Sequence, residues 1–176
     1  PEEPWFQSEW KGADKAGKSR GFEVIKLGVP DGEKVLAAID SLAALGAKGF
    51  VICTPDVRLG PAIMSKAKQA GLKVITVDDQ FVGPDGKPMT GVPYLGMSAS
   101  KIGESVNGTD CIDELRKSKP TGFHGSMRVS ALSEGFRTSE MLYQWVKDGV
   151  APTLDTRTTG IFMTRANLDQ VLKDDQ

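Results

Sequence analysis

Apolar residues recur with two different spacings in the first half of the chain. Phe6, Trp10 and Ala13 recur at i, i+4 and i+7, which places them on one face of a helix that begins near Pro4 and ends at Gly17 or Gly21. Residues 74–77 instead form a short, continuous run rich in β-branched side chains, typical of a strand buried on both faces. Together the two patterns predict further helices over 33–45 and 59–70, and strands over 22–28, 49–55 and 73–77.

The second half continues in the same way after an irregular, Gly- and Pro-rich loop over residues 82–93. Strands alternating with helices of about 11–14 residues, joined by short loops, favour βαβ units and an α/β fold with a parallel sheet. We predict strands over 94–97, 122–129 and 156–163, and helices starting at 98 and spanning 110–117, 133–149 and 165–172.

The strand over 73–77 ends in two adjacent carboxylates, Asp78 and Asp79. In open α/β sheets, ligands bind outside the carboxyl ends of the strands, so this pair lies where a ligand is expected. Carboxylates there can accept hydrogen bonds from several hydroxyls of a polar ligand. The alternative is structural: Asp79 caps the next element and Asp78 is only solvated.

The composition excludes several classes of protein. The 176 residues are 39% hydrophobic and 26% charged, as in a globular protein of one domain or two small lobes. A net charge of −1 without a basic stripe gives no nucleic-acid interface, and no apolar run approaches the roughly 20 residues of a membrane span. PEEPWF lacks the features of a signal peptide, so we expect either a cytoplasmic protein or one whose leader has been removed.

The residues that commonly bind metals are sparse. Cys53 lies in a predicted strand and Cys111 in a predicted helix, which gives neither a disulfide framework nor a metal-binding spacing. The single histidine, His124, has no cysteine or second histidine within motif distance. We therefore expect no cofactor and no metal.

Long stretches of the chain are similar to a known family. They are PEEPWFQSEWKGADKAGKSRGFEVIK, VPDGEK, SLAALGAKGFVICTPD, KVITVDDQF, KPM and SKIGE, followed by NGTDCIDEL, TGFHGS, SEMLYQWV and FMTRANL. These stretches resemble, in collinear order, the arabinose-binding members of the periplasmic binding proteins of bacterial ABC sugar importers. The resemblance implies a type I periplasmic-binding-protein-like fold, in which two α/β lobes with helix-flanked parallel sheets bind a sugar in the cleft.

The resemblance also implies which residues bind the ligand. The positions that match the family's sugar contacts and pocket wall are Glu3, Trp5, Cys53, Asp78, Asp79, Met97 and Asn107. Trp5 would stack on an apolar face of the sugar, the carboxylates would accept from its hydroxyls, and Asn107 would both donate and accept. Such a site suits a neutral monosaccharide, L-arabinose, D-galactose or D-fucose, and needs no metal.

Three of these residues also have ordinary structural interpretations. Trp5 fits a hydrophobic staple for the first helix, Met97 fits core packing, and Asn107 in an Asn-Gly pair fits a turn. From the residues alone we would favour the structural interpretation for all three. The resemblance favours a ligand role, most for Trp5 and Asp79 and least for Asn107.

The chain departs from the family in two places. An opening strand, which ends in a sugar-contacting lysine in the family, is expected to be absent before PEEPWF. A domain-sized piece, carrying an arginine and an asparagine, is expected to be missing between Glu104 and Asn107. We therefore expect a first lobe from residues 1–97 and 129–157, and a truncated second lobe from 98–128 and 158–176.

The expected function is that of a periplasmic solute-binding protein that delivers a monosaccharide to an ABC permease. The serious alternative is a truncated remnant of this family with weak or no sugar binding. An enzyme is disfavoured because Asp78 and Asp79, as strand neighbours, point to opposite faces and make a poor dyad, and because no P-loop or Ser-His-Asp set is present. A transcription regulator would need a helix-turn-helix headpiece, which the N-terminal residues do not contain.

Overall fold

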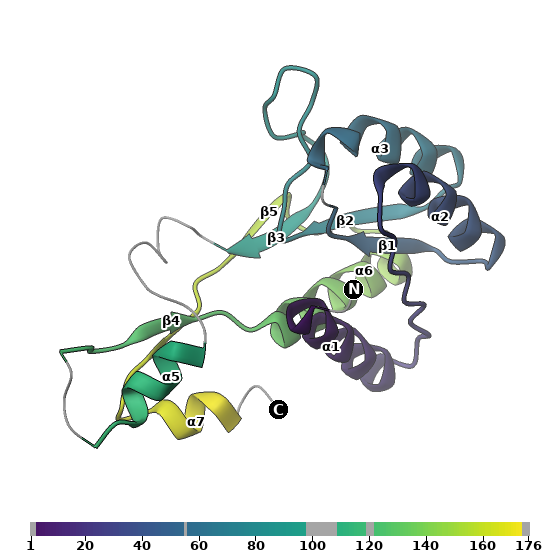
Figure 1. Cartoon of the computed structure of the whole chain (residues 1–176). Coiled ribbons are helices and arrows are strands. Elements are labelled where there is room, and N and C mark those ends of the chain that lie inside the picture. Colours follow the sequence, from purple (N-terminus) through teal and green to yellow (C-terminus); the bar gives the residue numbers. More distant parts are fainter. Residues whose placement is uncertain (1–2, 55, 98–108, 119–121, 174–176) are drawn as a thin grey trace. The chain divides into compact units, whose positions relative to one another are not determined.

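The computed structural model describes residues 3–54, 56–97, 109–118 and 122–173 (Figure 1). The chain forms two compact units. The first unit comprises residues 1–96 and 131–156, and the second comprises residues 97–130 and 157–176. The chain therefore passes from the first unit to the second, returns to the first at residue 131, and ends in the second.

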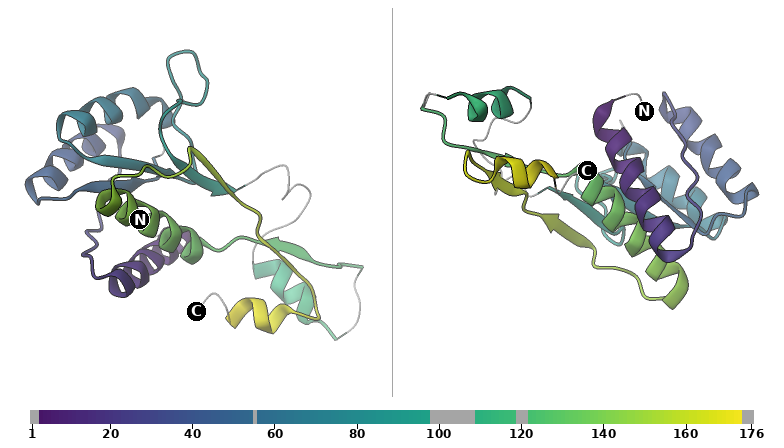
Figure 2. Two further views of the ribbon diagram at one scale, coloured as in Figure 1. Left: turned by 180° about the vertical axis from the view of Figure 1, so that it is seen from behind. Right: turned by 90° about the horizontal axis from the view of Figure 1, so that it is seen from below.

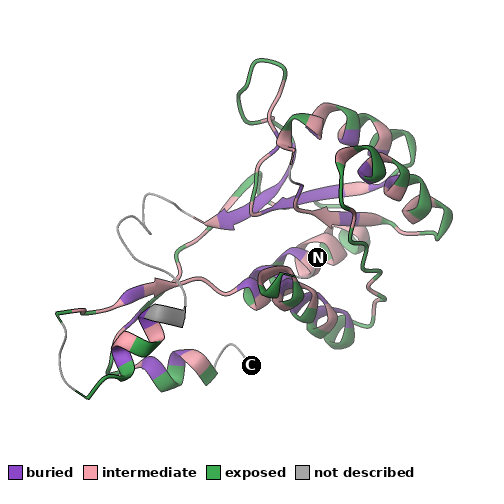
Figure 3. Ribbon diagram, in the orientation of Figure 1, coloured by how far each residue is buried: buried purple, intermediate pink, exposed green. Residues whose placement is uncertain are grey.

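A four-stranded sheet is the centre of the fold. Its strands, in spatial order, are β1 (Gly49–Ile52), β2 (Lys73–Val77), β3 (Tyr94–Met97) and β5 (Asp155–Thr158). β1 and β2 are parallel with Phe50 opposite Val74, and β2 and β3 are parallel with Thr76 opposite Tyr94. Every residue of β2 after Lys73 is buried, as its continuous apolar run predicts (Figure 3). The parallel sheet between helices confirms the predicted α/β class.

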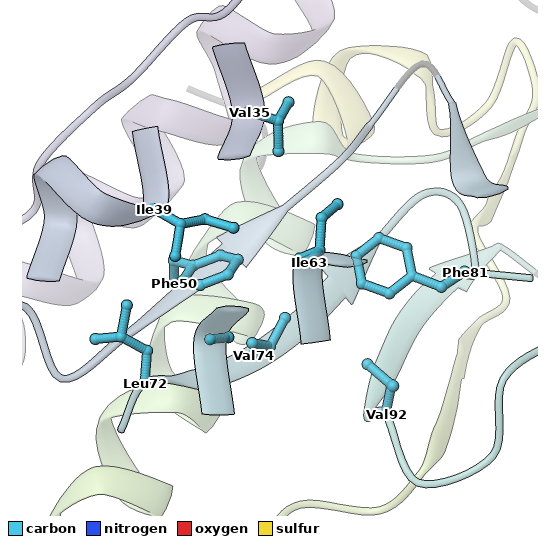
Figure 4. Packing of buried hydrophobic residues seen from close by; sticks show 9 residues of the cluster. Val35, Ile39, Phe50, Ile63, Leu72, Val74, Phe81 and Val92 are labelled. Carbon is cyan, nitrogen blue, oxygen red and sulfur yellow. The ribbon is translucent and has the colours of Figure 1, made fainter. Parts of the chain in front are cut away.

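One face of this sheet is covered by α2 (Gly32–Ala44) and α3 (Gly60–Gln69), with the short helix η1 (Val57–Leu59) leading into α3 (Figure 1). Asp31 caps α2 by accepting a hydrogen bond from the backbone N–H of Lys34 over 2.9 Å. The apolar side chains of both helices pack on those of β1 and β2 to form the main core (Figure 4). Its buried members are Val35, Ile39, Phe50, Ile63, Ala67, Leu72, Val74, Phe81 and Val92.

The other face carries α1 (Pro4–Arg20) and α6 (Ala131–Asp148), which lie side by side (Figure 2). Two glycines allow α1 and α6 to pack closely against each other. A Cβ atom on Gly12 would lie 2.0 Å from the carbonyl oxygen of Leu132, and one on Gly135 would lie 2.0 Å from the carbonyl oxygen of Glu9. The two helices therefore approach to backbone contact, which only glycine allows at these positions.

Two predicted strands are corrected by the structure. Residues 22–28 were predicted as a strand, but they form no regular element. A strand requires a ladder partner. Within the described part of the chain, the edge strand β1 pairs with β2 and with no second strand, so residues 22–28 join no ladder there. Residues 156–163 were predicted as one strand, but Gly160, with a φ of 66°, separates β5 from β6 (Ile161–Met163). The helix predicted to start at residue 98 lies outside the described residues.

The second unit is smaller and has its own small core. It contains α5 (Thr109–Arg116), β4 (Ser126–Arg128), β6 and α7 (Leu168–Lys173), and β4 and β6 form an antiparallel pair. Its buried apolar cluster consists of Leu115, Met163, Leu168 and Val171. Ile161 and Phe162 of β6 are about half exposed, at 51% and 53%. This two-stranded sheet is therefore only partly covered.

Candidate functional site

A tight turn at Asp78 ends β2. The N–H of Asp79 donates to the carbonyl of Val77 over 2.7 Å, which closes a γ-turn, and Asp78 has a φ of 62°. This conformation is uncommon and costly for a residue other than glycine. Two more hydrogen bonds fix it: Asp78 N–H donates to the Leu95 carbonyl over 3.2 Å, and the Tyr94 hydroxyl donates to the Asp78 carbonyl over 2.9 Å. The turn therefore holds Asp78 in one position.

The Asp78 side chain meets the start of α1. The indole Nε1–H of Trp5 donates to Asp78 Oδ2 over 2.9 Å. Trp5 directly follows Pro4, which occupies the first turn of the helix as predicted. Since the donor and the acceptor are 73 residues apart in the chain, this bond ties the helix start to the end of β2.

Two glutamates complete a cluster of carboxylates around Asp78. Glu9 lies one turn after Trp5 on α1, and Glu134 lies in the first turn of α6. One carboxylate oxygen from each of Glu9, Asp78 and Glu134 lies within 4.8 Å of the other two. Glu9 is 8% exposed and Glu134 is 1% exposed. The close approach of α1 and α6 at Gly135 brings the two glutamates together.

This environment changes the pKa of the carboxyl groups. Burial raises the pKa of Glu9 to about 8, and the negative charges of Asp78 and Glu134 act in the same direction. Burial also raises the pKa of Asp78 above its ordinary value, and the charge of Asp79 adds to the rise, whereas hydrogen bonds to Trp5 and Glu134 oppose it. The cluster therefore favours a bound proton or another positive charge.

Asp79 and Cys53 lie next to this cluster. Asp79 is exposed, and its Oδ2 lies 4.0 Å from the Sγ atom of Cys53, which is half-buried just after β1. Burial raises the pKa of the Cys53 thiol to about 12, and the charges of Asp78, Asp79 and Glu9 add to this rise. The two aspartates thus differ: Asp78 belongs to the buried cluster, and Asp79 is exposed at the carboxyl end of the sheet.

The structure brings four of the seven expected ligand-binding residues together, namely Trp5, Cys53, Asp78 and Asp79. Glu3 is exposed at the N-cap of α1 and makes no capping bond with its side chain. Met97 ends β3, is half-buried, and belongs to the second unit, where its carbonyl accepts from Arg157 Nη1 over 3.2 Å. Asn107 lies outside the described residues.

Glu9 and Glu134 were not predicted as site residues from the sequence, although their positions carry a signal. Both occupy the buried stripe of their helices. Glu9 is three residues from Phe6 and four from Ala13, and Glu134 shares a face with Ala131 and Thr138. A charged residue within an apolar stripe is rarely buried without a partner, and this pattern would have marked both glutamates.

An α/β fold with carboxylates and a tryptophan at the carboxyl end of its central strand suits a protein that binds a polar solute. Residues 1–106 match the family model of the periplasmic binding proteins and sugar binding domain of the LacI family. The chain belongs to this family, as its resemblance predicts.

Two curated relatives match almost the whole chain. The L-arabinose-binding periplasmic protein of Escherichia coli (strain K12) is 35% identical over 288 residues, which cover 98% of this chain and 88% of the relative. The ABC transporter L-arabinose-binding periplasmic protein of Azospirillum brasilense is 31% identical over 286 residues, covering 97% and 86%. The first alignment is 112 positions longer than the 176 residues of this chain, so at least that many positions hold a residue of the relative only. Both names describe sugar-binding periplasmic proteins and neither describes an enzyme.

A solved structure supports the fold. An ABC transporter solute binding protein from Agrobacterium vitis, bound with α-D-tagatopyranose, superposes with a TM-score of 0.68 at 14% identity, covering 98% of this chain and 95% of that protein. At this level of identity the likeness shows the fold alone, which is the type I periplasmic binding fold. Among the described helices, none is both long and apolar enough to cross a membrane.

Proposed function

We propose that this chain is the sugar-binding component of a bacterial ABC importer, and that it binds a neutral monosaccharide of the arabinose type in the periplasm. The observation that carries the proposal is the collinear match to two relatives that are both named L-arabinose-binding. The geometry of the first unit supports it, because an indole and carboxylates lie together at the carboxyl end of β2.

In this proposal, the roles of three residues follow from their contacts. The hydrogen bond from Trp5 to Asp78 fixes the orientation of the indole, whose ring face would stack on the apolar face of the sugar. Asp79 is exposed and would accept hydrogen bonds from the sugar hydroxyls. Neutral hydroxyls suit these acceptors, because a sugar brings donors without the negative charge that the carboxylate cluster would repel.

The partner in this proposal is an ABC permease, which would receive the sugar. We further propose that residues 1–97 and 129–157 form the first lobe and that residues 98–128 and 158–176 form a truncated second lobe. The division of the chain into two compact units supports this assignment. Among its described residues, the second unit has four short elements and a buried apolar cluster of four residues, which fits a reduced lobe.

The alignment length favours a second candidate, a family member with weak or no sugar binding. At least 112 positions of the alignment have no residue in this chain. Each hydrogen bond that the sugar or the protein loses costs about 1–3 kcal/mol when the group is left buried and unpaired. Three such losses would weaken binding by roughly two to six orders of magnitude.

A titration with L-arabinose, followed by isothermal calorimetry and tryptophan fluorescence, distinguishes the two candidates. We expect saturable heat and a saturable emission change, with D-galactose run in parallel. Trp5→Phe should abolish the emission change, whereas Trp10→Phe, on the same helix, should retain it. Asp79→Ala should weaken binding at least about tenfold, the effect of about 1.4 kcal/mol. No heat up to tens of millimolar sugar would overturn the proposal and support the second candidate.

A further inference from the structure

The cluster of Glu9, Asp78 and Glu134 has the arrangement of a cation site. The three residues come from α1, the turn after β2, and α6, so three separate elements converge on one point. Each offers a carboxylate oxygen, and these oxygens lie within 4.8 Å of one another. Hard divalent cations take carboxylate oxygens as ligands, which is the chemistry that this cluster presents.

A second observation also points to a ligand. Glu9 is 8% exposed and extends its carboxylate into the cluster, where its Oε1 atom is buried and has no hydrogen-bond partner among the described residues. Asp78 Oδ1 is buried in the same way. Neither residue forms an ion pair with a described lysine or arginine. Buried carboxylate oxygens without a hydrogen-bond partner are costly, and a bound cation would supply the missing partner.

The spacing of the carboxylate oxygens is compatible with an ion of the size of Ca²⁺. Ca²⁺ binds oxygen at about 2.3–2.6 Å, so two of its ligands are at most about 5.2 Å apart. Mg²⁺ differs in demanding near-ideal octahedral geometry and in keeping several of its waters, which makes it a poorer fit to a cluster of protein carboxylates. The oxygens of the cluster all lie within 4.8 Å of one another, which is inside the span that Ca²⁺ allows.

We propose that Glu9, Asp78 and Glu134 bind a divalent cation of the size of Ca²⁺. Three carboxylates supply up to six oxygens, which reaches the six to eight ligands that Ca²⁺ takes. The ion would neutralise two of the three carboxylate charges, and Asp78 Oδ2 would still accept from Trp5. The cation would therefore fix Asp78 and, through it, the orientation of the Trp5 indole.

Terbium luminescence tests the site on the full chain without sugar. After dialysis against a chelator, Tb³⁺ is added and tryptophan is excited, because Trp5 contacts Asp78 and can sensitise a bound ion. We expect saturable Tb³⁺ emission that Ca²⁺ displaces at about 10⁻⁵–10⁻³ M and that the same concentration of Mg²⁺ leaves in place. No saturable emission would overturn the proposal and indicate that the cluster holds protons instead.

Two variants test which carboxylates bind the ion. Glu134→Gln should weaken Tb³⁺ binding at least about tenfold, and Glu9→Gln provides the same test if Glu134→Gln does not fold. The matched control is Glu140→Gln, which removes a charge from the same helix at its ion pair with Arg20 and should leave the affinity unchanged. Wild-type affinity in both cluster variants, or equal losses in the control, would overturn the proposal. Because no sugar is present, the result is independent of the sugar titration.

Discussion

The two faces of the central sheet in the first unit are packed in different ways. On the side of α2 and α3, the buried side chains are apolar, and Ile39 and Ile63 are at most 2% exposed. On the side of α1 and α6, the helices meet at Gly12 and Gly135, and the buried residues include Glu9, Glu134 and Thr138.

This difference indicates that one face of the sheet mainly stabilises the fold and the other carries the proposed ligand chemistry. Apolar burial stabilises a fold at about 25 cal/mol per Å², so the α2–α3 face is expected to supply most of the stability. Buried carboxylates contribute little or oppose folding unless they are neutralised, and their presence on the α1–α6 face is explained by the ligand chemistry proposed for it. We therefore expect substitutions on the two faces to have effects of different size and, at one position, of opposite sign.

The largest loss is expected on the apolar face. Ile39→Ala removes a side chain that is 2% exposed and leaves a cavity between α2 and the sheet. The free energy of unfolding, measured with urea, should fall by about 2–5 kcal/mol. Leu45→Ala, at the end of the same helix, is the control, since Leu45 is 63% exposed and should change stability by less than about 0.5 kcal/mol. Equal losses in the two variants would contradict the assignment of this face as the core.

A smaller loss is expected where the helices of the polar face touch. Gly135→Ala places a Cβ atom 2.0 Å from the carbonyl oxygen of Glu9, so α1 and α6 must move apart. Urea denaturation should show a loss of about 1–3 kcal/mol, although alanine alone favours a helix over glycine by about 1 kcal/mol. Arg137→Ala, exposed on the same helix, should be nearly neutral. A gain for Gly135→Ala would mean that the helices are not in backbone contact.

A change of opposite sign is expected at Glu9. Glu9→Gln removes a buried negative charge whose Oε1 atom has no partner among the described residues. In chelator at pH 8, the variant should gain about 1–3 kcal/mol of unfolding free energy, because the cost of burying the charge disappears. Glu140→Gln, which removes one partner of an exposed ion pair, should lose no more than about 1 kcal/mol. A loss of stability in Glu9→Gln would show that the polar face stabilises the fold as the apolar face does.

The last change concerns the reactivity of one side chain and leaves the stability of the fold unaltered. Burial and the neighbouring carboxylates raise the pKa of Cys53 to about 12, so little thiolate is present at pH 8. Alkylation of Cys53 by iodoacetamide, followed by peptide mass spectrometry, should be more than about 100-fold slower than in the chain unfolded by guanidinium. A rate close to that of the unfolded chain would show that the thiol lies outside the field of Asp78, Asp79 and Glu9.

The sequence predicted the strands best where the apolar run was continuous. The run at 74–77 predicted a strand buried on both faces, and β2 ends at Val77 with Asp78 and Asp79 directly after it. The alternating pattern of residues 22–28 predicted a strand that does not form. Alternation shows which side chains are apolar, but it does not show whether the segment has a partner strand. Whether such a segment becomes a strand depends on a partner, and among the described strands β1 pairs with β2 alone.

The candidate site was predicted in part. The pair of carboxylates after β2 followed from the position of the strand, and the choice of Trp5 followed from the family resemblance. The hydrogen bond between Trp5 and Asp78 joins residues 73 positions apart, a distance over which local patterns carry no information. Glu9 and Glu134 each interrupt the apolar stripe of their own helix, which marks them as unusual, but the sequence does not show that the two lie together beside Asp78.

The sequence by itself determined the α/β class, the positions of most helices, and the exposed carboxylate at the end of the central strand, because these depend on spacing within one segment. Only the tertiary structure decided that three carboxylates meet. Their meeting requires the backbone contact of α1 with α6 at Gly135 and the turn that holds Asp78 at a φ of 62°. The physical reason is that charge and burial act through space, so the pKa of Glu9 depends on neighbours that lie far from it along the chain.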